Sequence, residues 1–150
     1  MSQQNRFVER KHRHIVETGL SLLSHSHVPH TYWDNVFLMA TYLINFLPTT
    51  HLSFSPFEKL YKHAPDFSSL NFFGCACFPF LHPFNRNKLD LRCKCCVFID
   101  YSNSHWGFKC LDWSICKIFV SRHVIFDEGS FPFANLDANP ISRNHLNLKA

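Results

Sequence analysis

The feature that most constrains the fold of this chain is a change in the spacing of its apolar residues near Asn71. Before Asn71, apolar residues recur every three or four positions, which is the spacing of one helix face. After Asn71, short runs rich in β-branched and aromatic residues alternate with turn residues, which is typical of short strands. The sequence therefore predicts an α+β fold in which helices come first and antiparallel strands follow.

Local signals set the bounds of the first two predicted helices. Asn5 is a candidate N-cap for a helix that runs through Leu23. Thr31 and Asp34 have the spacing of a loose capping box for a second helix, which Pro48 ends. We expect these two helices to pack their apolar faces into a core.

A third, short helix has the clearest local signal in the chain. Ser55 is a candidate N-cap, Pro56 suits the first turn, and Glu58 is the acid expected at the third position. We expect this helix to stop near Pro65.

The second half of the chain predicts a small antiparallel barrel. Five runs have strand-like composition: 72–80, 95–101, 106–111, 115–120 and 123–126. We therefore predict a helical segment over 1–66, a barrel over 67–133, and a disordered tail over 134–150, where no periodicity is seen.

Positive charge is concentrated in two places, although the formal net charge is only +4. The first fourteen residues hold Arg6, Arg10, Lys11 and Arg13 against Glu9. Residues 86–94 hold Arg86, Lys88, Arg92 and Lys94 against Asp90. Two basic patches of this kind are what a phosphate backbone would contact.

The chain shows no secretory signal and no apolar run long enough to cross a bilayer. Its seven cysteines, an odd number, indicate reduced thiols and hence an intracellular protein. We expect no membrane partner.

Two groups of residues have some likeness to metal ligands. The first group is Cys75, Cys77, Cys93, Cys95 and Cys96, but one residue between paired cysteines is a poor zinc spacing, so buried core thiols are the favoured interpretation. The second group, His25, His27 and His30, lies around Pro29 with no neighbouring Cys or acid, which favours ordinary loop histidines. We predict no bound metal in either place.

Several runs of residues carry a family resemblance. They are QQNRFVERKHRHIVE, YWDNVFLMATYLINFLPT, SPFEKLYKHAPDFSSLNFFGCACF, KLDLRCKCCVFIDYS and VSRHVIFDE. Together they resemble the end of the catalytic core of copia-type LTR-retrotransposon integrases and the SH3-like barrel that follows it. The resemblance extends to about Phe133.

What the resemblance implies for catalysis centres on Glu9. Integrases of this family use two Asp and one Glu to bind two divalent ions, Mg or Mn, and Glu9 matches the Glu. Both Asp would lie upstream of Met1, so we expect Glu9 not to act alone, no enzyme activity and no cofactor. The alternative role for Glu9 is a surface ion pair with Arg13, four residues further along the helix.

The chain departs from the family pattern at three places. Arg6 replaces a Gly, where the helix dipole would disfavour a cation in the first turn. Asp100 also stands where a Gly is usual, and Trp113–Cys116 replaces a turn that commonly holds Pro and Gly. We therefore expect a marginally stable barrel.

The sequence predicts a non-catalytic, C-terminal fragment of a retrotransposon integrase with residual nucleic-acid binding. Contacts are expected to be weak and sequence-tolerant, and to come from Arg10, Lys11, Arg13, Lys88, Arg92 and Lys94. Other integrase or polyprotein segments are further candidate partners, and the family suggests the nucleus. The alternative is a protein-interaction or structural module, or an inert remnant.

Overall fold

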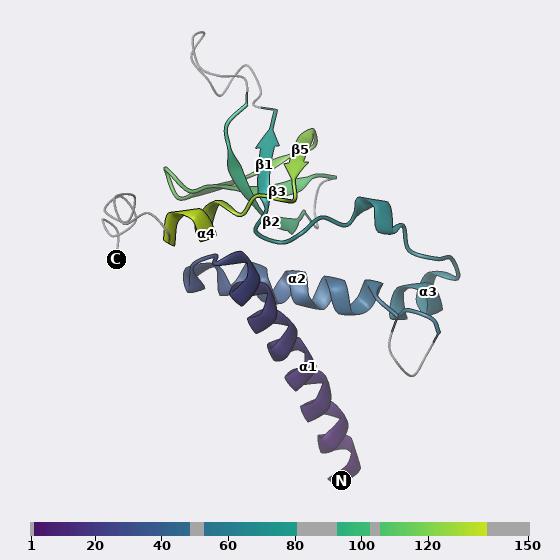
Figure 1. Ribbon diagram of the computed structural model, residues 1–150. Coiled ribbons are helices and arrows are strands. Elements are labelled where there is room, and N and C mark those ends of the chain that lie inside the picture. Colours follow the sequence, from purple (N-terminus) through teal and green to yellow (C-terminus); the bar gives the residue numbers. More distant parts are fainter. Residues whose placement is uncertain (1, 49–52, 81–92, 103–105, 138–150) are drawn as a thin grey trace. The chain divides into compact units, whose positions relative to one another are not determined.

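The structure is a computed structural model that describes residues 2–48, 53–80, 93–102 and 106–137 (Figure 1). Internal contacts divide the chain into two compact units near residue 70, with residues 26–28 grouped with the second unit. Helices make up the first unit and an antiparallel sheet dominates the second. The predicted α+β fold class is confirmed.

The first unit begins with α1 (Ser2–Ser26), followed by a 3-10 turn (His30–Tyr32) and α2 (Trp33–Phe46). Because α1 already includes Asn5, the prediction that Asn5 is the N-cap is wrong. It follows that Arg6 lies in the second turn of α1, away from the first-turn position where the dipole penalty is largest.

The start of α2 also differs from the sequence prediction. Its N-cap position is Tyr32, and no side chain caps it by a hydrogen bond. Asp34 instead accepts a hydrogen bond from the Asn35 side-chain amide at 3.0 Å. The 3-10 turn before α2 replaces the capping box, because its own backbone hydrogen bonds lead directly into the helix.

The helix α3 (Pro56–Tyr61) begins as predicted. The Ser55 hydroxyl accepts a hydrogen bond from the Glu58 amide at 3.1 Å. The helix ends earlier than Pro65, because Lys62 adopts a left-handed conformation (φ 61°) and terminates it. A second 3-10 turn (Phe67–Ser69) follows, capped by the Asp66 carboxylate.

Five strands form one antiparallel sheet in the order β4-β3-β2-β1-β5. Their bounds are β1 (Ala76–Pro79), β2 (Cys96–Tyr101), β3 (Phe108–Asp112), β4 (Lys117–Ser121) and β5 (Val124–Asp127). Each lies within or beside one of the five predicted runs.

The topology requires the sheet to curl. Strands β4 and β5 stand at opposite edges, so in a flat sheet they would be about 19 Å apart, at four strand spacings. Only Arg122 and His123 connect Ser121 to Val124, and this link spans at most about 11 Å. The edges must therefore approach each other, as they do in a small barrel.

The inner face of the curled sheet is lined by aromatic rings and thiols. Phe98 packs edge-on against Phe108 and Phe126, with ring centroids 6.0 and 5.4 Å away. Cys77 stands opposite both Cys96 and Phe126 in the register, so it shares their face. Small thiols beside large rings fill the narrow interior.

The segment after β5 is more ordered than the sequence indicates. Helix α4 (Pro132–Asp137) occupies part of the predicted tail 134–150, and Phe133 within it is buried. Pro132 at the first helical position and an apolar anchor explain a helix that has no periodic pattern. Residues 138–150 lie outside the described residues.

Within the described parts of the chain, no helix combines the length and apolar character needed to cross a membrane.

Candidate nucleic-acid interface

Three arginines of α1 form one exposed face. Arg6, Arg10 and Arg13 are four and three residues apart on a continuous helix, and all are exposed. At about 100° per residue their side chains fall within an arc of about 60°, over about 10 Å of helix axis. We call Arg6, Arg10 and Arg13 the arginine face.

Lys11 lies on a different side of α1. It is rotated by about 100° from Arg10, and its ammonium group sits over the Phe7 ring at 5.9 Å from the centroid. Of the predicted residues, α1 therefore brings Arg10 and Arg13 together and separates Lys11 from them. Arg6, which belongs to the first basic patch but is not among the predicted phosphate contacts, completes the face.

Glu9 borders the arginine face and is exposed. No ion pair joins it to Arg13 in the described part of the chain, so the predicted surface pair is not formed. The next acid on the helix, Glu17, is about 12 Å further along the axis. Glu9 alone does not fit the two-ion site that the family resemblance implies.

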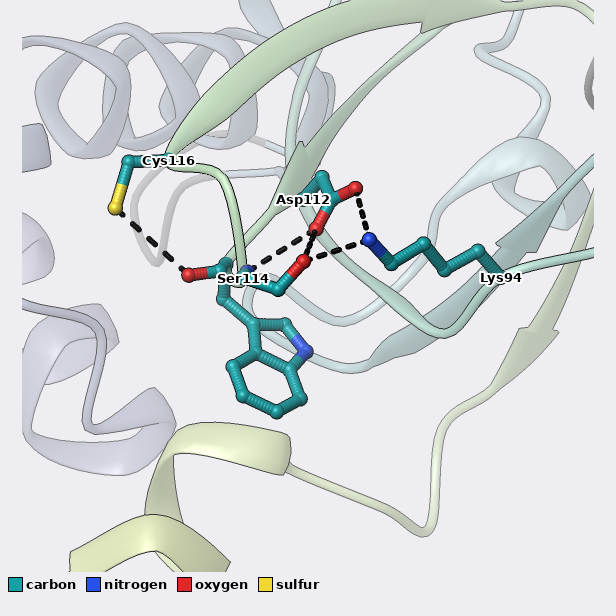
Figure 2. A network of polar contacts seen from close by, with 5 residues as sticks. Lys94, Asp112, Ser114 and Cys116 are labelled. Carbon is teal, nitrogen blue, oxygen red and sulfur yellow. Dashed lines mark hydrogen bonds and ion pairs between the residues drawn. The ribbon is translucent and has the colours of Figure 1, made fainter. Parts of the chain in front are cut away.

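The second predicted patch is represented by Lys94, because Lys88 and Arg92 lie outside the described residues. The Lys94 ammonium group donates to Asp112 and to the Ser114 hydroxyl, each at 2.6 Å (Figure 2). The Asp112 side chain is only 6% exposed, whereas that of Lys94 is 45% exposed. Lys94 therefore already has a carboxylate partner within the fold.

The Asp112 carboxylate organises the turn between β3 and β4. It accepts hydrogen bonds from the Ser114 amide at 3.1 Å and from the Ser114 hydroxyl at 2.7 Å (Figure 2). Burial raises the pKa of Asp112, but the hydrogen bonds from Lys94 and Ser114 together outweigh burial and hold the pKa below its ordinary value. The carboxylate is thus kept charged.

The same turn resolves one departure from the family pattern. Cys116 takes the left-handed conformation (φ 52°) that Gly would supply, and its thiol lies 3.7 Å from the Trp113 carbonyl oxygen (Figure 2). The hydrogen bonds that Ser114 donates to the Asp112 carboxylate replace the Pro and Gly turn chemistry. The spacing Asp-x-Ser at the end of a strand is the sequence signal that could have revealed this.

Asp100, another departure from the family pattern, is also satisfied. It lies at a β-bulge in β2, is buried, and pairs with Lys109 of β3 at 2.7 Å. The Tyr101 amide donates to its other oxygen at 2.9 Å. A charge at this position is tolerated because the neighbouring strand supplies its partner.

The cysteines behave as core residues. Cys75, Cys77 and Cys96 are buried, as predicted, whereas Cys93 and Cys95 are partly exposed. Burial raises the pKa of Cys75 to about 12, and burial and the nearby Asp112 carboxylate raise that of Cys96 to about 12. A hydrogen bond with Cys110 and burial also raise the pKa of Cys77.

Within the described residues, no three His, Cys, Asp or Glu side chains are grouped closely enough to hold a metal ion. His25 and His27 lie at or just after the end of α1, and His30 begins the 3-10 turn.

The sequence of the chain matches a known domain and known proteins. Residues 75–139, which include all five strands, match the retroviral polymerase SH3-like domain. The chain is 51% identical over 134 residues to the "Retrovirus-related Pol polyprotein from transposon RE1" of Arabidopsis thaliana, which covers 89% of the chain. It belongs to the copia-type retrotransposon Pol polyproteins.

Two further Pol polyproteins are similar to the chain, which supports its place in this family. The RE2 polyprotein of Arabidopsis thaliana is 50% identical over 88% of the chain, and the TNT 1-94 polyprotein of Nicotiana tabacum is 34% identical over 84%. The chain spans about a tenth of the length of these polyproteins: 9% for RE1 and RE2 and 10% for TNT 1-94. No solved structure matches the chain.

Proposed function

We propose that this Pol segment binds nucleic acid through the phosphate backbone, without sequence preference and without catalysis. The observation that supports this most is the arginine face of α1, in which three exposed guanidinium groups have no carboxylate partner among the described residues. Guanidinium groups bind phosphate oxygens in a bidentate manner and read no bases when they do so. Lys11, Lys88 and Arg92 are further proposed phosphate contacts, and Lys94 contributes only if it leaves Asp112.

Salt dependence is the direct test of backbone binding. Each phosphate contact releases counterions, so the logarithm of affinity falls with the logarithm of salt concentration by about 0.9 per contact on duplex DNA. Removing Arg6, Arg10 and Arg13 together should therefore flatten this slope by about 2 to 3. Alanine is the best helix former, so the triple alanine variant should keep α1 intact.

The control for this experiment is Lys59→Ala. Lys59 is an exposed cation on α3, in the same unit but on another helix. It should change the slope by much less than the arginine variants. The triple variant removes three charges and Lys59→Ala removes one, so an equal change of slope per removed charge would mean that net charge alone, and no specific face, sets the affinity.

No catalytic role is assigned to Glu9 in this proposal. Among the described residues it stands without a second carboxylate in reach. Magnesium-dependent strand cleavage is measured in the same samples, and none is expected. Cleavage that disappears in Glu9→Gln would overturn the non-catalytic assignment.

A second candidate function is protein docking. Phe7 and Val8 are exposed on α1 and lie away from the arginine face, where another polyprotein segment could cover them. Absence of DNA binding even at low salt would favour this function over nucleic-acid binding.

A further inference from the structure

Trp106 is unusually exposed. It is 93% accessible, although tryptophan is among the residues that proteins most often cover. Val120 of β4, whose side chain lies against the neighbouring residue Gly107, is 47% exposed. An indole in solvent on a backbone with further exposed apolar surface is a candidate contact site.

The backbone beneath Trp106 is tightly held. The adjacent Gly107 lies so close to β4 that an added Cβ would be 2.9 Å from both the Ser121 carbonyl oxygen and the Val120 side chain. Phe108, the next residue, pairs with Ser121 in the register, and Arg122 directly follows Ser121. Trp106 and Arg122 thus flank one close contact, between Gly107 just before β3 and the end of β4, with the indole in solvent.

The charged side chain nearest to this contact in the register is Arg122. It is exposed and has no acidic partner among the described residues. Lys117 stands at the other end of β4, opposite Asp112. An exposed ring and an unpaired guanidinium group that adjoin the same backbone contact suit a ligand that has both a flat apolar face and a negative charge.

We propose that Trp106 stacks on one unpaired base of single-stranded DNA while Arg122 contacts a neighbouring phosphate. The inference rests on the proposed nucleic-acid binding and adds a preference for unpaired strands. In a duplex both faces of each base are already stacked, so only an unpaired base can offer a face to the indole. The Ser121 hydroxyl donates to the His123 carbonyl oxygen at 3.1 Å, so it is left to meet a ribose 2′-hydroxyl only as an acceptor.

The test compares two strands with identical charge. One is an oligothymidylate of about twenty nucleotides, long enough for a single stacking site and its flanking phosphates, and the other is the same backbone without bases. Binding of the full chain to each is followed by fluorescence anisotropy at one salt concentration. The wild-type chain should bind the oligothymidylate about 5-fold or more tightly than the abasic strand, as expected for one stacked base.

Three variants locate the effect. Trp106→Ala should abolish the preference for bases, and Trp106→Phe should retain most of it because phenylalanine still stacks. Trp33→Ala is the matched control, since Trp33 is also an exposed tryptophan but lies on α2, in the other unit. Circular dichroism melts confirm that each variant folds.

The outcomes separate this inference from the proposed function. A preference that survives Trp106→Ala, or equal binding of both strands by the wild-type chain, would overturn the stacking site and leave backbone binding in place. Binding to neither strand would overturn both. A preference for the matching oligouridylate RNA over the DNA strand would overturn the assignment to DNA.

Discussion

Asp112 connects groups that are distant in the sequence. Lys94 precedes β2, Asp112 ends β3, and Ser114 lies in the turn that follows (Figure 2). A nearly buried carboxylate is stabilised here by charge-assisted and neutral hydrogen bonds, whose loss would leave an unpaired charge in the fold. One residue therefore secures the turn between β3 and β4.

The Asp112 network predicts a loss of stability in acid. Because the folded-state pKa of Asp112 is lowered, its stabilisation is present above the unfolded-state value near 4 and is lost as the pH falls through the folded value. Asp112→Asn should lower the free energy of unfolding by about 1 to 3 kcal/mol at pH 7. Urea melts at pH 7 and pH 3 measure this, and an equal loss at both would contradict the charged role of Asp112.

The left-handed Cys116 predicts a stabilising substitution. Cys116→Gly removes a conformational cost of about 1 to 2 kcal/mol, offset by the extra freedom of glycine in the unfolded chain, and should raise stability by about 0.5 to 1 kcal/mol. Ile115→Gly is the control, because Ile115 lies in the same turn without a positive φ. This substitution should destabilise the protein. Thermal melts measure both effects, and a midpoint for Cys116→Gly below that of the wild-type chain would refute the assignment of strain at Cys116.

At the scale of elements, the proposed phosphate binding by α1 and the stability of α1 are in opposition. Arg6, Arg10 and Arg13 are like charges at helical spacings of three and four, each pair destabilising the helix by about 0.2 to 0.5 kcal/mol. Residues 5–14 are exposed, so no packing offsets this cost within the described chain. Phosphates bound to the face would relieve the repulsion.

This opposition yields a prediction for a single substitution. Arg10→Ala should increase the helical circular dichroism signal at low salt, because it removes two like-charge neighbours and adds the best helix former. The same variant should bind duplex DNA more weakly. A variant that loses helicity together with affinity would instead show that Arg10 has a structural role.

How well each element could be predicted depends on how local its cause is. Ser55 and Glu58 contact each other within one turn, so their spacing alone predicted the start of α3 correctly. The partners of Lys94 and Asp100 are Asp112 and Lys109, which strand pairing brings together. Sequence patterns identified the strands but not these pairings, and Lys94 was therefore interpreted as a free cation.

The same reasoning explains the partial prediction of the candidate interface. Helical spacing places Arg10 and Arg13 on one face and could have added Arg6. A helix capped at Asn5 would put Arg6 in the first turn, where the dipole disfavours a cation, whereas α1 begins at Ser2 and places Arg6 in the second turn. Lys11 is turned away by its position in the helix and lies over Phe7, which composition alone does not show.

For the molecule as a whole, thiol reactivity reports on the integrity of the sheet. Cys75, Cys77, Cys96 and Cys110 are buried, and raised pKa values suppress the thiolate in the first three, whereas Cys93, Cys95 and Cys116 are at least partly accessible. A thiol reagent at pH 8 should modify Cys93 and Cys116 quickly, Cys95 more slowly because burial and the nearby Asp127 carboxylate raise its pKa, and the buried four only at the rate of unfolding. Rapid modification of all seven would contradict a folded second unit.

The chain combines an SH3-like sheet with a basic helix, and it spans about a tenth of the length of its Pol polyprotein relatives. Each unit has its own candidate contact to nucleic acid, the arginine face in the first and Trp106 with Arg122 in the second. The two contacts differ in chemistry, since one reads charge and the other requires an unpaired base. Substitutions in the arginine face should therefore change the salt dependence but not the preference for unpaired bases, and Trp106→Ala should do the reverse.

The central claim is that the arginine face of α1 binds the phosphate backbone. The most direct test is fluorescence anisotropy of an unrelated duplex across a salt series, with the wild-type chain, the Arg6, Arg10 and Arg13 triple alanine variant and Lys59→Ala. We predict steep salt dependence for the wild-type chain and Lys59→Ala, and a slope flatter by about 2 to 3 for the triple variant. An unchanged slope in the triple variant, or no binding by the wild-type chain at low salt, would contradict the account.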